Sequence, residues 1–192
     1  MGESDFWNSQ DAAQKVISEY RLLKAQTEGL GEIIAEFEDA TVGYQLAKEA
    51  GDKELLTEVD SCLHALLKKM DRVELQSLLS GKHDHRNCFV AIQAGDGGND
   101  ADDWASMLDR MYTTWWDRQG WKYEQISLVH GSEVGISGVS YLVKGLLSYG
   151  YMSCERGTHR LARVSPFNSQ GKRQTSFCTI DVMPEFDEED VE

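Results

Sequence analysis

The stretch that decides the fold is Cys88-Phe89-Val90-Ala91-Ile92-Gln93, followed by Ala94-Gly95-Asp96-Gly97-Gly98-Asn99-Asp100. A short apolar run before a glycine-rich segment is typical of a buried strand that ends in a tight turn. From Asp100 to about Arg118, apolar side chains recur every three or four residues, which predicts a helix. This strand, turn and helix together predict an α+β unit in the second half of the chain.

The segments on either side of this unit have different patterns. Four more strand-like runs follow it, at 121–129, 138–144, 158–164 and 176–183. From Ser9 to Leu79, in contrast, apolar residues keep a helical spacing, interrupted at Ala50-Gly51-Asp52 by a stop and a new start. We therefore expect an α+β protein. An antiparallel helical hairpin or bundle in residues 1–84 precedes a small α+β domain in residues 85–192, with a mixed or antiparallel sheet and one main helix.

Two glycines, Gly29 and Gly31, fall inside the first helical segment, and we expect them to kink it. The segment that joins the two halves of the chain is polar and contains His83 and His85. These histidines, with Cys88, Cys62 and His64, lack the regular spacing of zinc ligands, so a polar linker is the favoured interpretation. No metal site and no cofactor are predicted.

The net charge of −14 argues against indiscriminate binding to nucleic acid, which needs a basic surface. The charge is unevenly distributed, however. Between Glu155 and Phe177 only Glu155 is acidic, while the basic residues are Arg156, Arg160, Arg163, Lys172 and Arg173. The last residues of the chain are mostly acidic. A local basic face on an acidic protein would allow selective contact with RNA.

Other bulk features exclude several classes of protein. There is no run of about 18 apolar residues, so no membrane span is expected. The first residues have neither the basic nor the apolar region of a secretory signal, and a cytoplasmic location is expected. The four cysteines are scattered, which favours reduced thiols. His159 has no serine or cysteine nucleophile placed beside it in the sequence, so no catalytic residue is predicted.

The glycine-rich turn, Gly95-Asp96-Gly97-Gly98, superficially resembles a phosphate-binding loop. No Gly-Lys-Ser or Gly-Lys-Thr follows it, and the glycine spacing of a dinucleotide-binding loop is also absent. Asp100 and Asp102 in the first turn of the helix would repel phosphate. A plain tight turn is the favoured interpretation. The alternative is that the start of the helix presents backbone N–H groups to the edge of a base.

The tripeptide Ser165-Pro166-Phe167 lies in a polar loop between two of the predicted strands. Proline restricts the residue before it, which holds Ser165 in an extended conformation. The serine hydroxyl can donate and accept a hydrogen bond, and an exposed phenylalanine can pack on a base. Gln174 and Thr175 follow on the returning segment and can reach the same place. From composition alone, an ordinary surface loop is the favoured interpretation.

Three blocks of sequence, taken together, resemble the bacterial class I peptide-chain release factors, and specifically the release factor 2 type. The first block runs from Ile92 to Gly98 and continues through 103–108 to 110–112. The second is 157–163, and the third is 165–169 with Arg173 and 175–177. The Ser-Pro-Phe tripeptide resembles the element that distinguishes factors reading UAA and UGA from those reading UAA and UAG.

The resemblance implies a role for each part of the chain. The helical domain would face the stalk-base protein of the ribosome, and the α+β domain would enter the decoding centre as a monomer, among 16S and 23S rRNA. The residues implied in reading the stop codon of the mRNA are Gly97, Gly98 and Asp100 for the first base, and Ser165, Pro166, Phe167, Gln174 and Thr175 for the others. Contacts to rRNA or phosphate are expected from Arg156, His159, Arg160, Arg163, Lys172 and Arg173.

The sequence departs from the family pattern at three points. Asp100 stands where the family usually has Glu, and Gln174 stands where it usually has His. The Gly-Gly-Gln tripeptide that promotes peptidyl-tRNA hydrolysis occurs nowhere in the 192 residues. We therefore expect stop-codon binding without hydrolysis, as a fragment of a full-length factor or as a product that lacks the catalytic domain. The alternatives are a release-factor-derived RNA-binding or ribosome-associated protein and, with less support, a metal- or phosphate-dependent enzyme.

Overall fold

The computed structural model describes residues 10–186, and between residues 10 and 28 it describes only the side chain of Tyr20. Contacts along the chain divide it between Ser80 and Gly81 into two units. The division into functional domains at residue 84 stays a prediction. What the sequence predicts for the first nine residues and for the acidic end of the chain lies outside the described residues.

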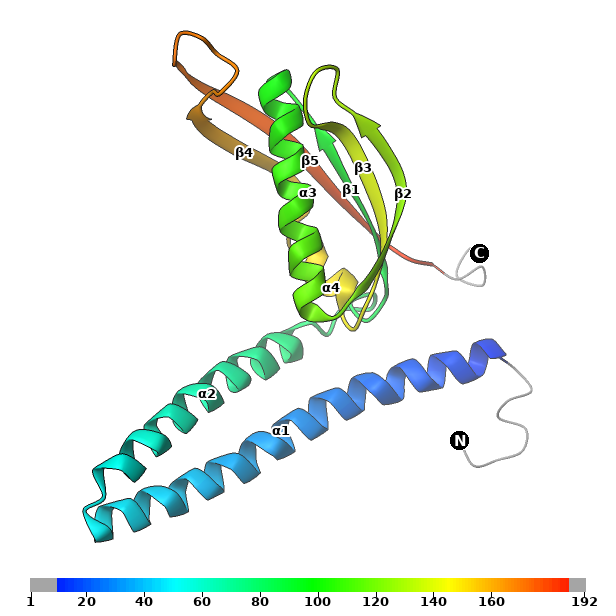
Figure 1. Cartoon of the computed structure of the whole chain (residues 1–192). Coiled ribbons are helices and arrows are strands. Elements are labelled where there is room, and N and C mark those ends of the chain that lie inside the picture. Colours follow the sequence, from blue (N-terminus) through cyan, green and yellow to red (C-terminus); the bar gives the residue numbers. More distant parts are fainter. Residues whose placement is uncertain (1–9, 187–192) are drawn as a thin grey trace. The chain divides into compact units, whose positions relative to one another are not determined.

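The first unit is a helical hairpin of α1 (Gln10–Ala50) and α2 (Lys53–Leu78) (Figure 1). Gly51 adopts a positive φ of 67°, which ends α1. Asp52 then caps α2, because its carboxylate accepts hydrogen bonds from the N–H groups of Glu54 at 2.9 Å and Leu55 at 3.1 Å. The stop and start expected at this point are therefore confirmed.

Gly29 and Gly31 do not interrupt α1, since both lie inside one helix of 41 residues, and the kink expected there stays a prediction. A glycine costs a helix only about 1 kcal/mol relative to alanine, which packing against a second helix can offset. Gly29 lies in that packed region, where an added Cβ would be 3.4 Å from a methyl group of Val73 on α2. The helix therefore continues through both positions.

The two helices contact each other along a repeat of seven residues. Buried side chains on α1 are Ile33, Ala40 and Ala47, and those on α2 are Val59 and Leu66. A second repeat of seven on α1 is exposed: Leu30, Phe37 and Tyr44. A repeat of seven is typical of helices that contact along a narrow seam. In this hairpin the first of these two sets of α1 residues is buried, and the second set stays exposed to solvent.

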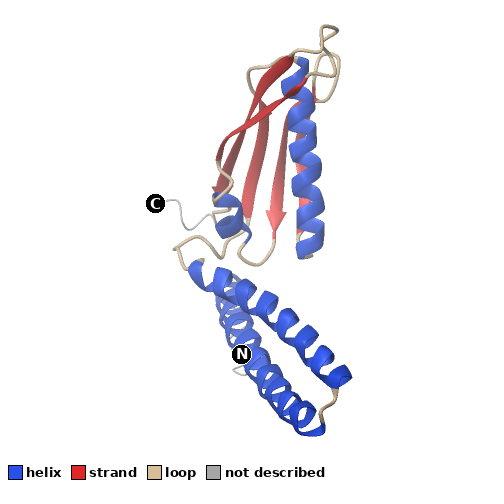
Figure 2. Ribbon diagram, turned by 90° about the vertical axis from the view of Figure 1, so that its left-hand side faces the viewer, coloured by secondary structure: helices blue, strands red, loops and turns tan. Residues whose placement is uncertain are grey.

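The second unit contains a five-stranded antiparallel sheet in the order β2-β3-β1-β5-β4. The strands are β1 (Cys88–Ala94), β2 (Lys122–His130), β3 (Ile136–Lys144), β4 (Gly157–Val164) and β5 (Arg173–Pro184). Helix α3 (Asn99–Gln119) lies along one face of the sheet (Figure 2). The predicted α+β class is thus confirmed, and the sheet is antiparallel. A short helix, α4 (Ser148–Ser153), was not predicted.

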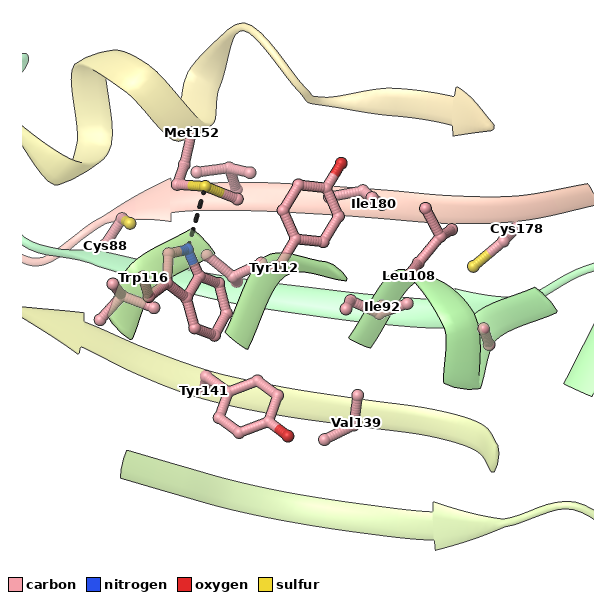
Figure 3. Close-up of a cluster of buried hydrophobic side chains, with 14 of the residues drawn as sticks. Cys88, Ile92, Leu108, Tyr112, Trp116, Val139, Tyr141, Met152, Cys178 and Ile180 are labelled. Atoms are coloured by element: carbon pink, nitrogen blue, oxygen red, sulfur yellow. Dashed lines mark hydrogen bonds between the residues drawn. The ribbon is translucent and has the colours of Figure 1, made fainter. Parts of the chain in front are cut away.

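The core lies between α3 and the sheet. Alternate residues of β1, β3 and β5 are buried, as expected for strands with one covered face. Figure 3 shows Leu108 and Trp116 of α3 gathered with Ile92 of β1 and Ile180 of β5. The indole N–H of Trp116 points to the sulfur of Met152 on α4, 3.4 Å away. This packing fixes α3, and therefore its first turn, relative to the strands.

Among residues 10–186, no helix is both long and apolar enough to cross a bilayer. In the same range, the described side chains include no group of three or more His, Cys, Asp or Glu residues that could hold a metal ion. All four cysteines are free thiols. Cys88 and Cys178 are buried in the core, which raises the pKa of Cys88 to about 12 and that of Cys178 to about 11.

Candidate nucleic-acid interface

The glycine-rich turn joins β1 to the start of α3 and is tied to the neighbouring strand β5. The N–H of Gly95 donates to the carbonyl of Phe177 at 2.9 Å, and the N–H of Phe177 donates to the carbonyl of Asp96 at 3.0 Å. Gly97 has a φ of 141°, and a Cβ there would lie only 3.0 Å from Ser176. Glycine is therefore required at Gly97 both by the backbone conformation and by the space available.

Asp100, in the first turn of α3, is the centre of the site. Its side chain is buried, with 8% of the residue exposed. One carboxylate oxygen accepts a hydrogen bond from the Ser165 hydroxyl at 2.5 Å, and the other accepts one from the Arg163 guanidinium at 3.3 Å. A single carboxylate thus connects α3 to the end of β4 and to the loop that follows it.

The Ser165 side chain is turned into the protein rather than toward solvent, with 4% of the residue exposed. Its hydroxyl donates to Asp100 and accepts the N–H of Phe167 at 3.1 Å, while its own N–H donates to the carbonyl of Lys172 at 3.3 Å. These bonds fix the start of the loop and leave the Phe167 side chain in solvent, at 42% exposed. The loop therefore exposes the ring of Phe167 next to a serine that is hydrogen-bonded to α3.

Arg163 is held by α3 as well. Its guanidinium lies 2.5 Å from the carboxylate of Asp103, in addition to the longer contact with Asp100. The hydrogen bond with Asp103 is the main reason that the pKa of Arg163 is raised above its usual value. This arginine is thus engaged inside the protein, and its expected contact with phosphate stays a prediction.

Gln174 and Thr175 lie on β5 near the same loop, and both are exposed. Gln174 is paired with Arg163 across the two strands, so both side chains lie on the face covered by α3. Thr175 is paired with Ala162 and lies on the opposite face. The two neighbouring residues therefore cannot address one base from the same side of the strand.

The predicted basic residues are spread along β4 and end at the start of β5. Arg160, Lys172 and Arg173 are exposed. Arg156 forms an ion pair with Asp181 at 2.9 Å, and His159 lies 2.8 Å from the carbonyl of Glu155. Arg156 precedes Ser165 by nine residues along an extended strand, which corresponds to roughly 30 Å at about 3.3 Å per residue. Arg156 and His159 are therefore not part of the cluster around Asp100.

Sequence reasoning assigned no role to Asp103, although its carboxylate makes the shorter of the two contacts with Arg163. The sequence indicated the position of Asp103 only through its spacing of three residues from Asp100. Residues three apart on a helix share a face, so Asp103 had to lie beside Asp100. Nothing in the sequence pairs these carboxylates with an arginine that is 60 residues away.

Comparison with known proteins identifies the class to which this fold and site belong. Residues 1–180 match the model of the PCRF domain, and the chain belongs to this family. Among named relatives, the chain is 44% identical over 185 residues to peptide chain release factor 2 of Exiguobacterium sp., covering 96% of this chain and 50% of the relative. It is 41% identical over 192 residues to peptide chain release factor 2 of Staphylococcus haemolyticus, covering 100% of this chain and 52% of the relative.

The structure is similar to that of RF2 of Thermus thermophilus, with a TM-score of 0.64 and 38% sequence identity. That match covers 98% of this chain and 53% of the Thermus protein. The chain thus spans about half the length of the relatives it matches. The resemblance to factors of the release factor 2 type is therefore confirmed over nearly the whole of the chain.

Proposed function

We propose that this chain carries the stop-codon recognition part of a termination factor of the release factor 2 type, reading UAA and UGA in the ribosomal A site. The observation that supports this most is the anchoring of the Ser165-Pro166-Phe167 loop to the first turn of α3 through Asp100. That contact brings together two segments that lie 65 residues apart in the sequence, and the two segments form one surface. The loop belongs to one block that resembles the family, and Asp100 lies between the two parts of another.

The chemistry of Ser165 suits a second base that is either adenine or guanine. Adenine presents a donor at its exocyclic amine, where guanine presents an acceptor. A hydroxyl can accept from the first or donate to the second, but the Ser165 hydroxyl is buried and gives its one proton to Asp100, so it must turn away from Asp100 toward the codon to donate to guanine. Phe167, exposed beside it, offers a ring face for stacking. Gly97 and Gly98 leave the backbone at the start of α3 free of side chains.

We further propose the partners that this role requires. Arg160, Lys172 and Arg173 are exposed and suited to rRNA phosphates of the decoding centre, in 16S and 23S rRNA. The helical hairpin would contact the stalk-base protein, and the chain would act in the cytoplasm as a monomer. Peptide release would need a Gly-Gly-Gln element, which these 192 residues do not contain. In a release assay we expect this chain alone to give no hydrolysis.

The proposal is tested by comparing two variants and the unmodified chain for binding to ribosomes programmed with UGA, UAA, UAG or a sense codon. Phe167→Ala should reduce the preference for UGA more than it reduces affinity for the ribosome, because stacking on a base is worth about 1–3 kcal/mol. Arg160→Ala, the matched control on β4, should weaken binding to all of these ribosomes alike. Equal losses of preference in the two variants would refute the assignment.

The same experiment addresses the second candidate, a release-factor-derived RNA-binding or ribosome-associated protein without termination activity. The observation that favours it is the burial of Ser165, whose hydroxyl already donates to Asp100. That candidate predicts equal binding to UGA, UAA, UAG and sense codons, or tight binding to free RNA. Selective binding to UGA and UAA would exclude it.

A further inference from the structure

The loop between β2 and β3 reaches the first turn of α3 from another direction. Figure 1 shows this loop and the loop between β4 and β5 at the same end of the unit, where α3 begins. The β2–β3 loop is closed by a hydrogen bond from the N–H of Gly131 to the carbonyl of Gly135 at 3.1 Å. Its Glu133 carboxylate accepts a hydrogen bond from the Asn99 amide, the first residue of α3, at 2.5 Å.

The backbone of this loop touches α3 directly, with no room for a side chain between them. A Cβ added to Gly135 would lie 2.3 Å from the backbone carbonyl oxygen of Asp102. A Cβ added to Gly131 would clash first with the carbonyl oxygen of Val134 in the loop itself, and it would lie 2.6 Å from the Asp102 carboxylate. These distances are well below a van der Waals contact. Gly135 therefore allows an approach of the loop to α3 that any other residue would prevent, and Gly131 allows the tight turn of the loop itself.

The start of α3 needs such external support. Its N-cap residue is Gly98, which has no side chain to bond the free N–H groups of the first turn. The loop between β4 and β5 holds the turn through Asp100 and Asp103. The loop between β2 and β3 holds it through Asn99 and Asp102. The first turn of α3 thus has partners in both loops.

We propose that the β2–β3 loop is a positioning element for stop-codon reading, in which Gly135 and Glu133 fix the first turn of α3 against the codon. This inference rests on the proposed function, because it concerns the same surface. Neither residue lies in the blocks that resemble the release factors. Both act through Asn99 and Asp102 rather than by touching the codon.

The first test needs no ribosome and measures hydrogen exchange of the backbone amides at the start of α3. Gly135→Ala is compared with Gly120→Ala, because the two glycines have φ values of +66° and +70° and a new side chain is similarly strained at both. Only Gly135 is crowded, since a Cβ at Gly120 meets nothing within 4 Å. Exchange at Ala101 and Asp102 should rise by about tenfold in Gly135→Ala alone, the effect of roughly 1.4 kcal/mol on a local opening. Equal exchange in the two variants would overturn the inference.

The second test measures ribosome affinity with UGA and with UAG in the A site. Gly135→Ala should lower the ratio of the two affinities, while Gly120→Ala leaves it unchanged. If Gly135→Ala does not fold, Glu133→Ala supplies the same test with an expected loss of about two- to tenfold, and Glu133→Gln, which still accepts the Asn99 bond, should restore the ratio. If the unmodified chain discriminates the two codons and Gly135→Ala leaves the ratio of affinities unchanged, the positioning role is overturned. Absence of discrimination in the parent would refute the proposed function instead, and the exchange measurement would still decide whether the loop holds α3.

Discussion

Replacing Asp100 by alanine is the sharpest perturbation of the site. The change removes the acceptor of the Ser165 hydroxyl at 2.5 Å and of one Arg163 contact at 3.3 Å. A buried hydroxyl without a partner costs about 1–3 kcal/mol, and a hydrogen bond to a charged group contributes about 1.5–3 kcal/mol. Arg163 retains Asp103, which offsets part of the loss. We therefore expect the free energy of unfolding of the second unit to fall by about 2–3 kcal/mol.

The matched control is Asp103→Ala, because Asp103 contacts the same arginine from a more exposed position, with 32% of its side chain accessible. Because this ion pair is only partly buried and Ser165 keeps its acceptor in this variant, the loss should be smaller than that caused by Asp100→Ala. Both are measured by urea denaturation followed by tryptophan fluorescence, since four of the five tryptophans (positions 104, 115, 116 and 121) lie in the second unit.

A double-mutant cycle separates the contact from its surroundings. If Ser165 and Asp100 interact as described, the losses caused by Asp100→Ala and Ser165→Ala should not add, and the coupling energy should be about 1 kcal/mol or more. Additive losses would refute the contact. An Asp103→Ala loss equal to or larger than that of Asp100→Ala would refute the reasoning from burial.

Three other predictions concern the thiols and the helical hairpin. Cys88 and Cys178 should react with a thiol reagent only after unfolding, while the two exposed cysteines react in the native chain. Burial raises the pKa of Cys88 from 9.0 to about 12 and that of Cys178 from 9.0 to about 11. The unfolded chain therefore loses these protons at a lower pH than the folded chain does. The free energy of unfolding should therefore fall as the pH rises from about 9 toward 12, and it should fall less when Cys88 and Cys178 are both replaced by serine. A free energy of unfolding that does not change with pH in the unmodified chain would contradict this prediction. In the hairpin, Ile33→Ala should lower helix stability by about 2 kcal/mol or more, because Ile33 is buried. Phe37→Gln should change it by no more than about 0.5 kcal/mol, because Phe37 is exposed. Thermal unfolding followed by circular dichroism measures both changes.

Much of the fold follows from local patterns in the sequence. Cys88, Val90 and Ile92 belong to a short apolar run before a glycine-rich turn, and this pattern predicted β1. The turn at Gly51 and Asp52 was recognisable because a left-handed residue and a carboxylate cap have known preferences. The short helix α4 was missed since six residues are too few for a periodic signal.

The site could be predicted only in part, because its contacts join distant segments. Asp100 was expected to repel phosphate at a helix start, whereas in the structure it accepts a hydrogen bond from Ser165, 65 residues away. Ser165 was expected to offer a free hydroxyl, and it is instead buried. Gly135 carried no signal at all, since the reason for a glycine there is the backbone of Asp102 on another element. Tertiary contacts of this kind leave no periodic pattern along the chain.

The central claim is that the surface formed by the start of α3 and the Ser165-Pro166-Phe167 loop reads a stop codon. The most direct measurement is the equilibrium affinity of the unmodified chain for ribosomes that differ only in the A-site codon, UGA, UAA or UAG. We predict similar affinities for UGA and UAA and an affinity at least about tenfold lower for UAG, since one good base contact is worth about 1–3 kcal/mol. Equal affinities for all three codons would contradict the account.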